Sequence, residues 1–282
     1  MGDYEMAYKF GLIGYPIQHS LSPWIHEQFL QRTNLQGEYT IMEIDPHLNF
    51  DEEMDKLRKK ELNGFNITVP YKEKIVDYLD ELDDQAAHIG AVNTVLCKNG
   101  KWIGYNTDGI GYIRSLLQQF PQLEEKKDAN ILLLGAGGAA KGIYFALLKH
   151  GYQSVTIANR ALDKAKKLTQ KNPLSKIITL QEAEEKLSTF DCIIQTTSVG
   201  MKPETDRMII HLNNLKEGTI VSDIVYQPLR TKFLQTAESM NAQIHFGHTM
   251  LLYQAQYAFE IWTGLRPKMD KLDESLQNIL EG

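Results

Sequence analysis

Short apolar runs rich in β-branched and aromatic residues alternate along the chain with segments of helical periodicity. This alternation predicts an α/β fold. In the first part of the chain, strands are predicted over residues 8–14, 38–44, 65–69, 93–98 and 101–106. Helices are predicted over residues 23–34, 50–60, 72–82 and 108–120. Ser22 is placed to cap the first helix, and Pro23 to begin it. Asn99-Gly100 predicts a two-residue hairpin, which gives this mixed sheet an antiparallel edge.

The second part of the chain is more regular. Its apolar runs predict strands over residues 131–134, 155–158, 177–180, 192–196, 219–225 and 243–246. The run at 131–134 is continuously apolar, as expected for a strand that is covered on both faces. Helical patterns lie between several of these strands, so a doubly wound parallel sheet is expected. A long helix is predicted over 249–263, and a further amphipathic helix over 268–282.

Composition narrows the class of protein. The 282 residues suggest two domains at roughly 100–200 residues each. The formal net charge of −6 gives no general attraction to nucleic acid or to an anionic membrane, which favours a small-molecule partner. Two cysteines exclude a disulfide scaffold and fit a reducing compartment. We find no run of apolar residues long enough to span a bilayer and no signal peptide at residues 1–6, so a cytoplasmic protein is expected.

A glycine-rich segment follows the predicted strand 131–134 and begins a helix. Its residues are Gly135, Ala136, Gly137, Gly138, Ala139 and Ala140. In this context glycines allow a tight turn and close approach of a pyrophosphate, while the helix N-terminus supplies N–H donors. The segment therefore predicts a dinucleotide-binding loop; the alternative is a glycine-rich turn without a ligand.

The end of the next strand indicates which dinucleotide is bound. An NAD site usually places a carboxylate there for the ribose 2′-hydroxyl, but strand 155–158 is followed by Asn159 and Arg160. An arginine binds a 2′-phosphate instead, and Lys164 lies one helical turn further on. We therefore expect NADP(H); the alternative is that Arg160 is an ordinary solvated side chain.

A nicotinamide reaction at a carbonyl also needs a group that handles a proton. Lys72 follows a buried strand and Pro70, and Asp108 follows strand 101–106. Both are expected at the carboxyl ends of neighbouring strands, where open α/β sheets bind ligands. Spacing alone leaves Asp108 equally explained as a helix N-cap. No histidine or cysteine has the spacing of metal ligands, so we expect no metal.

Taken together, these segments resemble the shikimate dehydrogenase family over nearly the whole chain. Single signatures of this kind are weak, but their number and order are specific. Those that match are Gly14 to Pro23 (G-x-P-x-x-H-S-x-S-P), Asn66 to Lys72 (N-[VI]-T-x-P-x-K), Gly90 to Thr94 (G-A-[VI]-N-T), Asn106 to Gly109 (N-T-D-G), the Gly135 loop, Asn159-Arg160, Asp223 to Thr231 (D-x-x-Y-x-P-x-x-T) and Gly247 to Gln254 (G-x-x-M-L-x-x-Q).

The resemblance implies an NADP-dependent oxidoreductase that acts on a CH–OH group, reversibly reducing 3-dehydroshikimate to shikimate in the chorismate route to aromatic amino acids. It makes Lys72 and Asp108 the catalytic pair. It assigns the substrate to Ser20, Ser22, Thr68, Asn93, Tyr226 and Gln254, and adds Thr197 and Gly247 to the cofactor-binding residues Gly135, Ala136, Gly137, Gly138, Ala139, Asn159, Arg160 and Lys164. Such side chains suit a polyhydroxylated acid, which needs many neutral donors and acceptors.

Three positions depart from the family pattern. Gln195 stands where asparagine is usual, Ala161 where threonine often follows Asn-Arg, and His248 where a small residue is expected. Ala161 removes a hydroxyl that could contact a 2′-phosphate. Two alternatives to the main hypothesis stay open: a quinate/shikimate dehydrogenase with dual cofactor use, and a non-enzymatic NADP-binding regulator. The resemblance links quinate preference to threonine at position 22, so Ser22 argues against the quinate/shikimate enzyme, and Arg160 argues against its use of NAD. Retention of Lys72 and Asp108 argues against the regulator.

The order of these residues predicts the domain organisation. We expect a substrate-binding domain over 1–107, completed by the C-terminal helices of 247–282 because Gln254 returns to it. A Rossmann-type NADP-binding domain is expected over 108–246, with a cleft between the domains. The oligomeric state, monomer or homodimer, is left open.

Overall fold

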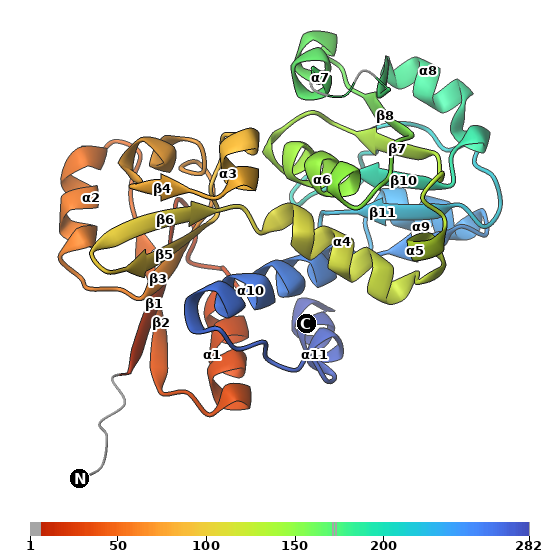
Figure 1. Cartoon of the computed structure of the whole chain (residues 1–282). Helices are drawn as coiled ribbons and strands as arrows, with labels where there is room; N and C mark the ends of the chain where they lie inside the picture. Colours follow the sequence, from red (N-terminus) through yellow and green to blue (C-terminus); the bar gives the residue numbers. More distant parts are fainter. Residues whose placement is uncertain (1–6, 171, 173, 282) are drawn as a thin grey trace. The chain divides into compact units, whose positions relative to one another are not determined.

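The computed structural model describes residues 7–170, 172 and 174–281. Residues 1–6, for which we expected no signal peptide, lie outside the described residues. The chain forms two compact units, each with its own six-stranded sheet (Figure 1). The first contains Met1–Thr107 and Gln254–Lys268, and the second contains Asp108–Tyr253 and Met269–Gly282. No helix in the described part of the chain is both long and apolar enough to cross a membrane.

The first unit has a mixed sheet in the order β2-β1-β3-β5-β6-β4. Its strands are β1 (Tyr8–Gly14), β2 (Gly37–Glu43), β3 (Gly64–Ile67), β4 (Glu81–Leu82), β5 (Thr94–Lys98) and β6 (Lys101–Tyr105). Strands β3, β5 and β6 are antiparallel neighbours, and the other pairs are parallel. The predicted hairpin is confirmed: Asn99 and Gly100 connect β5 to β6 with φ angles of 53° and 74°.

The helices of this unit cover both faces of its sheet. They are α1 (Ser22–Thr33), α2 (Phe50–Arg58), α3 (Asp84–Ile89), the 3₁₀ turn η1 (Lys74–Tyr78) and the second half of α10 (Gly247–Thr263). In α10, the Trp262 ring stacks on Phe10 with ring centroids 4.6 Å apart, and its indole N–H donates to the Val95 carbonyl at 2.8 Å. This burial of aromatic surface explains why a C-terminal segment completes a sheet built from the first hundred residues.

Two local predictions in this unit are wrong. Ser22 does not cap α1: Leu21 is the N-cap residue, and the Ser22 N–H instead donates to Ser20 Oγ at 3.2 Å. The predicted helix at 72–82 is only the single turn η1 followed by β4, because the chain pairs with β6 at Glu81. Pairing in the sheet thus overrides a helical pattern, and the short helix α3 was not predicted.

The second unit has a wholly parallel sheet in the order β12-β11-β10-β7-β8-β9. Its strands are β7 (Ile131–Leu134), β8 (Val155–Ala158), β9 (Lys176–Ile178), β10 (Cys192–Gln195), β11 (Ile220–Asp223) and β12 (Gln243–His245). Alternate residues of β7 enter different cores: Ile131 and Leu133 face one, Leu132 and Leu134 the other. The prediction of a doubly wound sheet is therefore confirmed.

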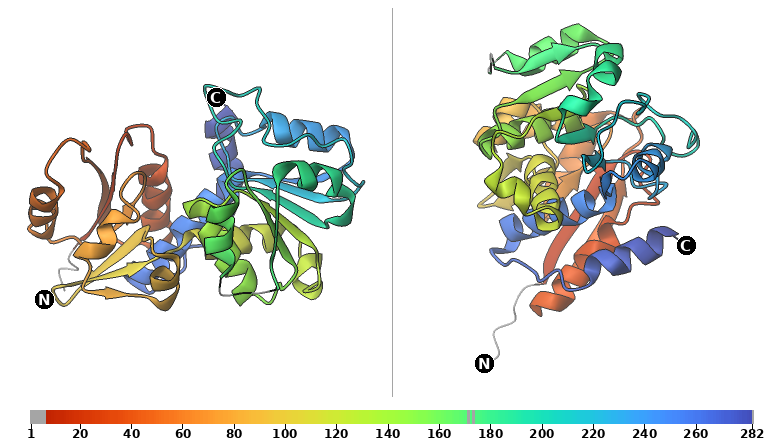
Figure 2. Two further views of the ribbon diagram at one scale, coloured as in Figure 1. Left: turned by 90° about the horizontal axis from the view of Figure 1, so that it is seen from above. Right: turned by 90° about the vertical axis from the view of Figure 1, so that its right-hand side faces the viewer.

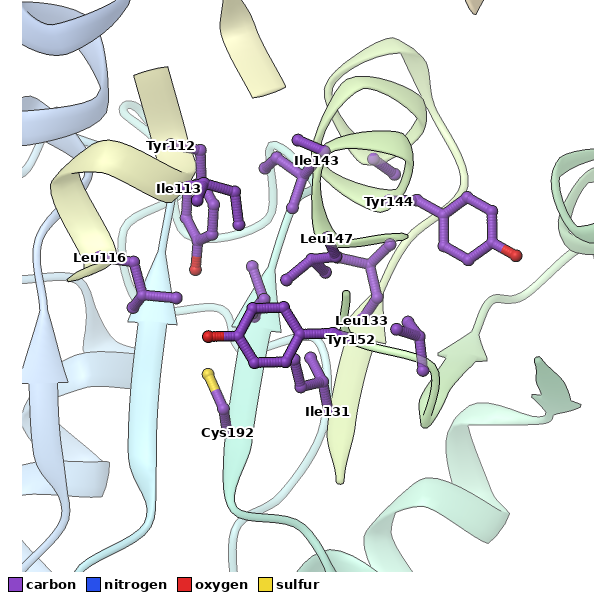
Figure 3. Packing of buried hydrophobic residues seen from close by; sticks show 14 of the residues in the cluster. Tyr112, Ile113, Leu116, Ile131, Leu133, Ile143, Tyr144, Leu147, Tyr152 and Cys192 are labelled. Carbon is purple, nitrogen blue, oxygen red and sulfur yellow. The ribbon is translucent and has the colours of Figure 1, made fainter. Parts of the chain in front are cut away.

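Helices cover both faces of the parallel sheet (Figures 1 and 2). They are α4 (Asp108–Gln119), α5 (Gln122–Glu125), α6 (Gly138–Lys149), α7 (Leu162–Thr169), α8 (Leu180–Glu185), η2 (Leu187–Thr189), α9 (Lys232–Ser239), the first half of α10 and α11 (Leu272–Glu281). Figure 3 shows Tyr112 and Leu116 of α4 and Ile143 and Leu147 of α6 packed over β7 and Cys192. This packing fixes the strand ends that carry the candidate cofactor residues.

The C-terminal segments divide differently from our expectation. We expected all of 247–282 to complete the first domain, but only Gln254–Lys268 groups with it. Residues 247–253 and 269–281 belong to the second unit, where Asp273 of α11 interacts electrostatically with His248 and Tyr253. The sequence pattern showed two helices but gave no sign of which apolar face each one covers.

One buried histidine makes the stability of this fold sensitive to acid. His26 in α1 is fully buried and stacks on Tyr39 with ring centroids 4.4 Å apart. Burial lowers the pKa of His26 from 6.5 to about 3. The unfolded chain therefore binds one more proton than the folded chain between these values, and acid favours unfolding.

We predict that His26→Phe flattens the loss of stability between pH 6.5 and about 3, because the variant has no imidazole to keep neutral. The free energy of unfolding of the unchanged protein should fall faster than that of the variant, by at most about 1.4 kcal/mol per pH unit. Urea denaturation across this range measures the difference. The exposed His47, changed to Asn, is the control and should keep the original slope; equal slopes for His26→Phe would contradict the prediction.

Candidate active site

Polar residues gather where strands of the first unit end. Asn93 precedes β5 and Thr107 follows β6, so the antiparallel hairpin brings both to the same edge of the sheet. The Asn93 side chain donates to Thr107 Oγ1 at 2.9 Å and accepts from the Thr107 N–H at 2.8 Å. Gln254 of α10 joins them, with its Oε1 3.4 Å from Asn93 Nδ2. Two of the predicted substrate residues, Asn93 and Gln254, are therefore in direct contact.

A second layer of polar side chains lies behind Asn93. Asn66 donates through Nδ2 to the Asn93 carbonyl at 3.1 Å and to Thr94 Oγ1 at 3.0 Å, and Tyr39 donates to Asn66 Oδ1 at 2.8 Å. All of these residues are buried, so each hydrogen bond fixes a group that would be costly to leave unpaired. Thr107, Asn66 and Tyr39 were missed as site residues. Thr107 and Asn66 belong to segments that match the family signatures, but a single tyrosine in a strand gives no sequence signal of a site.

The remaining predicted residues of this unit occupy two turns. Ser20 and Ser22 share a hydrogen bond, and Ser22 is buried. Thr68 directly follows β3, and its N–H donates to the Ile13 carbonyl at 2.9 Å. Lys72 is half-buried in the turn before η1, where its carbonyl accepts from the Val92 N–H at 2.7 Å. The backbone therefore holds Lys72 next to the segment that leads to Asn93.

In the second unit, the glycine loop has the geometry of a phosphate-binding turn. Gly135 follows β7 with φ of 115°, and a Cβ there would lie 2.6 Å from Thr196 Oγ1, so only glycine fits. Gly137 is the N-cap of α6 and Gly138 its first residue, and nothing lies within 4 Å of where their Cβ atoms would be. Space for a ligand therefore adjoins the free N–H groups of the helix start, which fits a pyrophosphate.

The end of β8 carries exposed positive charge. Asn159 donates its side-chain amide to the Ala161 carbonyl at 2.8 Å. Arg160 is exposed at the strand end, and Lys164 is exposed in the first turn of α7. Ala161 is the N-cap residue of α7 and provides no side-chain cap. A threonine there would accept a hydrogen bond from the helix, so this departure weakens α7 as well as removing a hydroxyl.

The ends of β10 and β11 carry the other predicted cofactor and substrate residues. Thr197 follows β10, Tyr226 follows β11, and Gly247 begins α10. A Cβ on Gly247 would lie 2.8 Å from the Asp223 carbonyl oxygen, so the helix start packs directly on the end of β11. Burial raises the pKa of the Asp223 carboxyl to about 7, while hydrogen bonds from Val225, Thr231 and Gln195 oppose that shift.

The strands that precede the catalytic candidates are not neighbours, as we expected them to be: Lys72 follows β3 and Asp108 follows β6, and β5 lies between these two strands. Lys72 belongs to the first unit, and Asp108 is the first residue of the second. Asp108 is the buried first residue of α4, directly after Thr107. Asp108 is thus the first residue inside the helix rather than the residue before it, so its alternative interpretation as an N-cap stays a prediction. Among the described residues there is no cluster of three His, Cys, Asp or Glu side chains that could hold a metal ion.

Three family models match the chain along its length. They are the shikimate dehydrogenase substrate binding domain at 12–95, shikimate/quinate 5-dehydrogenase at 116–226, and the shikimate 5′-dehydrogenase C-terminal domain at 247–271. A protein of Oceanobacillus iheyensis named shikimate dehydrogenase (NADP(+)) is 53% identical over 98% of this chain and 100% of its own length.

The chain belongs to the shikimate dehydrogenase family.

Solved structures of the family have the same fold. Shikimate 5-dehydrogenase from Thermus thermophilus, in complex with NADP(H) and shikimate, matches with a TM-score of 0.86 and 30% identity, covering 96% of this chain and 99% of that one. Quinate dehydrogenase from Corynebacterium glutamicum, in complex with NAD, matches with a TM-score of 0.87 and 26% identity, covering 96% and 99%. The shikimate dehydrogenase fold thus occurs with either cofactor, which makes Arg160 the residue to test.

We predict that Arg160→Ala weakens binding of NADP⁺ by about 10- to 100-fold and leaves binding of NAD⁺ within about twofold. The reason is that a charge-assisted bond to phosphate is worth roughly 1.5–3 kcal/mol, and only NADP⁺ has the 2′-phosphate. Calorimetric titration with each dinucleotide measures the ratio. Lys149→Ala, which removes an exposed cation at the opposite end of α6, is the control. Equal losses for both cofactors would remove Arg160 from 2′-phosphate recognition.

Proposed function

We propose that this protein catalyses the reversible NADPH-dependent reduction of 3-dehydroshikimate to shikimate. The observation that carries the proposal is the 53% identity, over the full length of the Oceanobacillus iheyensis protein, to a shikimate dehydrogenase (NADP(+)). The structure supports it with two features of that chemistry: a neutral polar cluster in one unit and a dinucleotide loop in the other. Its substrate and cofactor are then both small molecules.

The polar cluster suits a polyhydroxylated ring. Ser20, Ser22, Thr68, Asn93 and Gln254 supply hydroxyl and amide groups, which can both donate to and accept from a substrate hydroxyl. Lys72 adds the cation that a developing alkoxide requires. Tyr226 supplies a further hydroxyl from the second unit. We assign the substrate to these six neutral side chains together with Lys72.

The second unit has the residues to hold NADP(H). Gly135, Ala136, Gly137, Gly138 and Ala139 would hold the pyrophosphate at the start of α6. Asn159, Arg160 and Lys164 would bind the adenosine 2′-phosphate at the end of β8. Thr197 and Gly247 would line the other half of the cofactor. When bound, the cofactor supplies or accepts the hydride.

Lys72 and Asp108 are assigned the proton chemistry. In the reductive direction, the ketone oxygen gains negative charge as hydride is added to its carbon, and it needs one proton to become a hydroxyl. We assign Lys72 to stabilise that charge and donate the proton, and Asp108 to keep the lysine charged and oriented. In the oxidative direction, the same pair takes up the proton from the hydroxyl.

Two other functions compete with this one. The likeness to a quinate dehydrogenase in complex with NAD supports a dual enzyme that accepts quinate and NAD⁺, and Ala161 removes a hydroxyl from the cofactor side. A regulator that binds NADP(H) without turnover is the second. The retained Lys72 and Asp108 weigh against a regulator, which needs neither group.

We predict that the protein oxidises shikimate with NADP⁺ faster than any other combination of shikimate or quinate with NADP⁺ or NAD⁺. The increase in absorbance of the reduced nicotinamide measures the rate. Faster turnover of quinate with NAD⁺ would favour the dual enzyme. Absence of turnover with all four pairs would leave only the regulator.

We predict that Lys72→Ala lowers kcat by about 100-fold or more and changes KM for shikimate much less, because the lysine acts on charge that develops in the transition state. Steady-state kinetics with NADP⁺ at saturation measure both constants. Lys59→Ala, which removes an exposed lysine from the end of α2, is the control and should leave kcat unchanged. An unchanged kcat in Lys72→Ala would exclude Lys72 from the chemistry.

A further inference from the structure

Two buried polar side chains lie next to each other at the carboxyl edge of the parallel sheet. Gln195 is the last residue of β10 and Asp223 the last residue of β11, and they are paired in register. Both are almost completely inaccessible, with 1% and 0% of their surface exposed. Gln195 Nε2 donates to Asp223 Oδ1 at 3.2 Å. Neither residue was among the predicted contacts with substrate or cofactor.

Gln195 also closes the loop that follows its own strand. Its Nε2 lies 3.2 Å from the Thr197 carbonyl and 3.1 Å from the Val199 carbonyl, and its Oε1 accepts from the Thr197 N–H. One amide therefore fixes both backbone groups of Thr197. An asparagine is shorter by one methylene, so it cannot keep the contacts with Val199 and with Asp223 at the same time.

Asp223 likewise fixes the segment that follows its own strand, β11. Its Oδ1 accepts from the Val225 N–H at 2.9 Å, and its Oδ2 accepts from Thr231 Oγ1 at 2.7 Å. Thr231 in turn caps α9 by accepting from the Leu234 N–H at 3.3 Å. The segment that carries Tyr226 is thus held at both ends by one carboxylate.

The loop after β10 lies against the glycine loop after β7. Thr196 Oγ1 donates to the carbonyl of Leu134, beside Gly135, and a Cβ on Gly135 would lie 2.9 Å from Thr197 Cγ2. In the strand order, β10 and β11 lie on the opposite side of β7 from β8. With the pyrophosphate at β7 and the 2′-phosphate at β8, the nicotinamide half of a dinucleotide must extend over β10 and β11.

We propose that Gln195 and Asp223 act as one positioning unit that sets Thr197 for the nicotinamide half of the cofactor and Tyr226 for the substrate. The inference rests on the proposed function for the identity of that ligand. Neither side chain touches the ligand: each acts through the backbone of a loop. The departure from asparagine at 195 is then a device for joining the loop after β10 to the carboxylate of β11.

The test is a double-mutant cycle of Gln195→Asn and Asp223→Asn, with the Kd for NADP⁺ measured by calorimetry at a temperature where every variant is folded. Each single variant should raise Kd by about tenfold, since each loses a buried hydrogen bond to a charged or loop partner. The double variant should raise Kd no more than the worse single variant, because both changes break the same unit.

Asp191→Asn is the matched control. Asp191 precedes β10 at the amino edge of the same sheet and also ties strands to loops, accepting from Lys126 Nζ at 2.8 Å and the Asn130 N–H at 2.9 Å. It should lower the urea midpoint of unfolding while leaving Kd within about twofold.

Two outcomes would overturn the inference. One is that the Gln195 and Asp223 variants lower the unfolding midpoint but leave the Kd for NADP⁺ nearly unchanged, as a purely structural pair would. The other is that their effects on Kd multiply, as independent residues would. Because Kd needs no turnover, these results are separate from a failure of the unchanged protein to oxidise shikimate, which would overturn the proposed function alone.

Discussion

The second unit depends on burying both faces of its parallel sheet. The side chains of β7 alternate between two apolar cores, so no polar side chain can stand in the middle of that strand without losing its hydrogen bonds. The candidate cofactor residues accordingly stand at strand ends. Gly135 follows β7, Asn159 follows β8, and Gln195 and Asp223 end β10 and β11. The candidate cofactor site is a consequence of the way the core is packed.

The candidate site of the first unit differs, because it includes polar groups that are themselves buried. Asn93 is 3% exposed, yet each of its polar side-chain atoms has a partner, and Asn66 and Tyr39 support it from behind. A network that is fully satisfied in this way holds its members in one arrangement. Side chains that are held by such a network need little reordering when the substrate binds, which lowers the entropic cost of binding.

The sequence predicted the sheets better than the details of the site. Short runs of apolar and β-branched residues predicted β7 and β8 with their observed bounds, and Asn99-Gly100 predicted the hairpin, because each depends on local chemistry. The prediction of a helix at 72–82 was wrong, because part of this segment pairs with β6 as a strand. Tyr39 and the contacts of Gln195 could not be foreseen, since both depend on which strands become neighbours. The roles of Lys72 and Asp108 come from the family resemblance and stay predictions.

The first unit is assembled from two stretches of chain separated by the whole of 108–253. This arrangement has a consequence for synthesis on the ribosome. The strands that pack against Trp262 emerge well before it, at roughly 5–20 residues per second. During that interval the Phe10 ring lacks the Trp262 ring that stacks on it in the folded protein. The ribosome must therefore synthesise residues 108–253 before the first unit can close, and a chain that stops before Gln254 leaves apolar surface of the first unit exposed to aggregation.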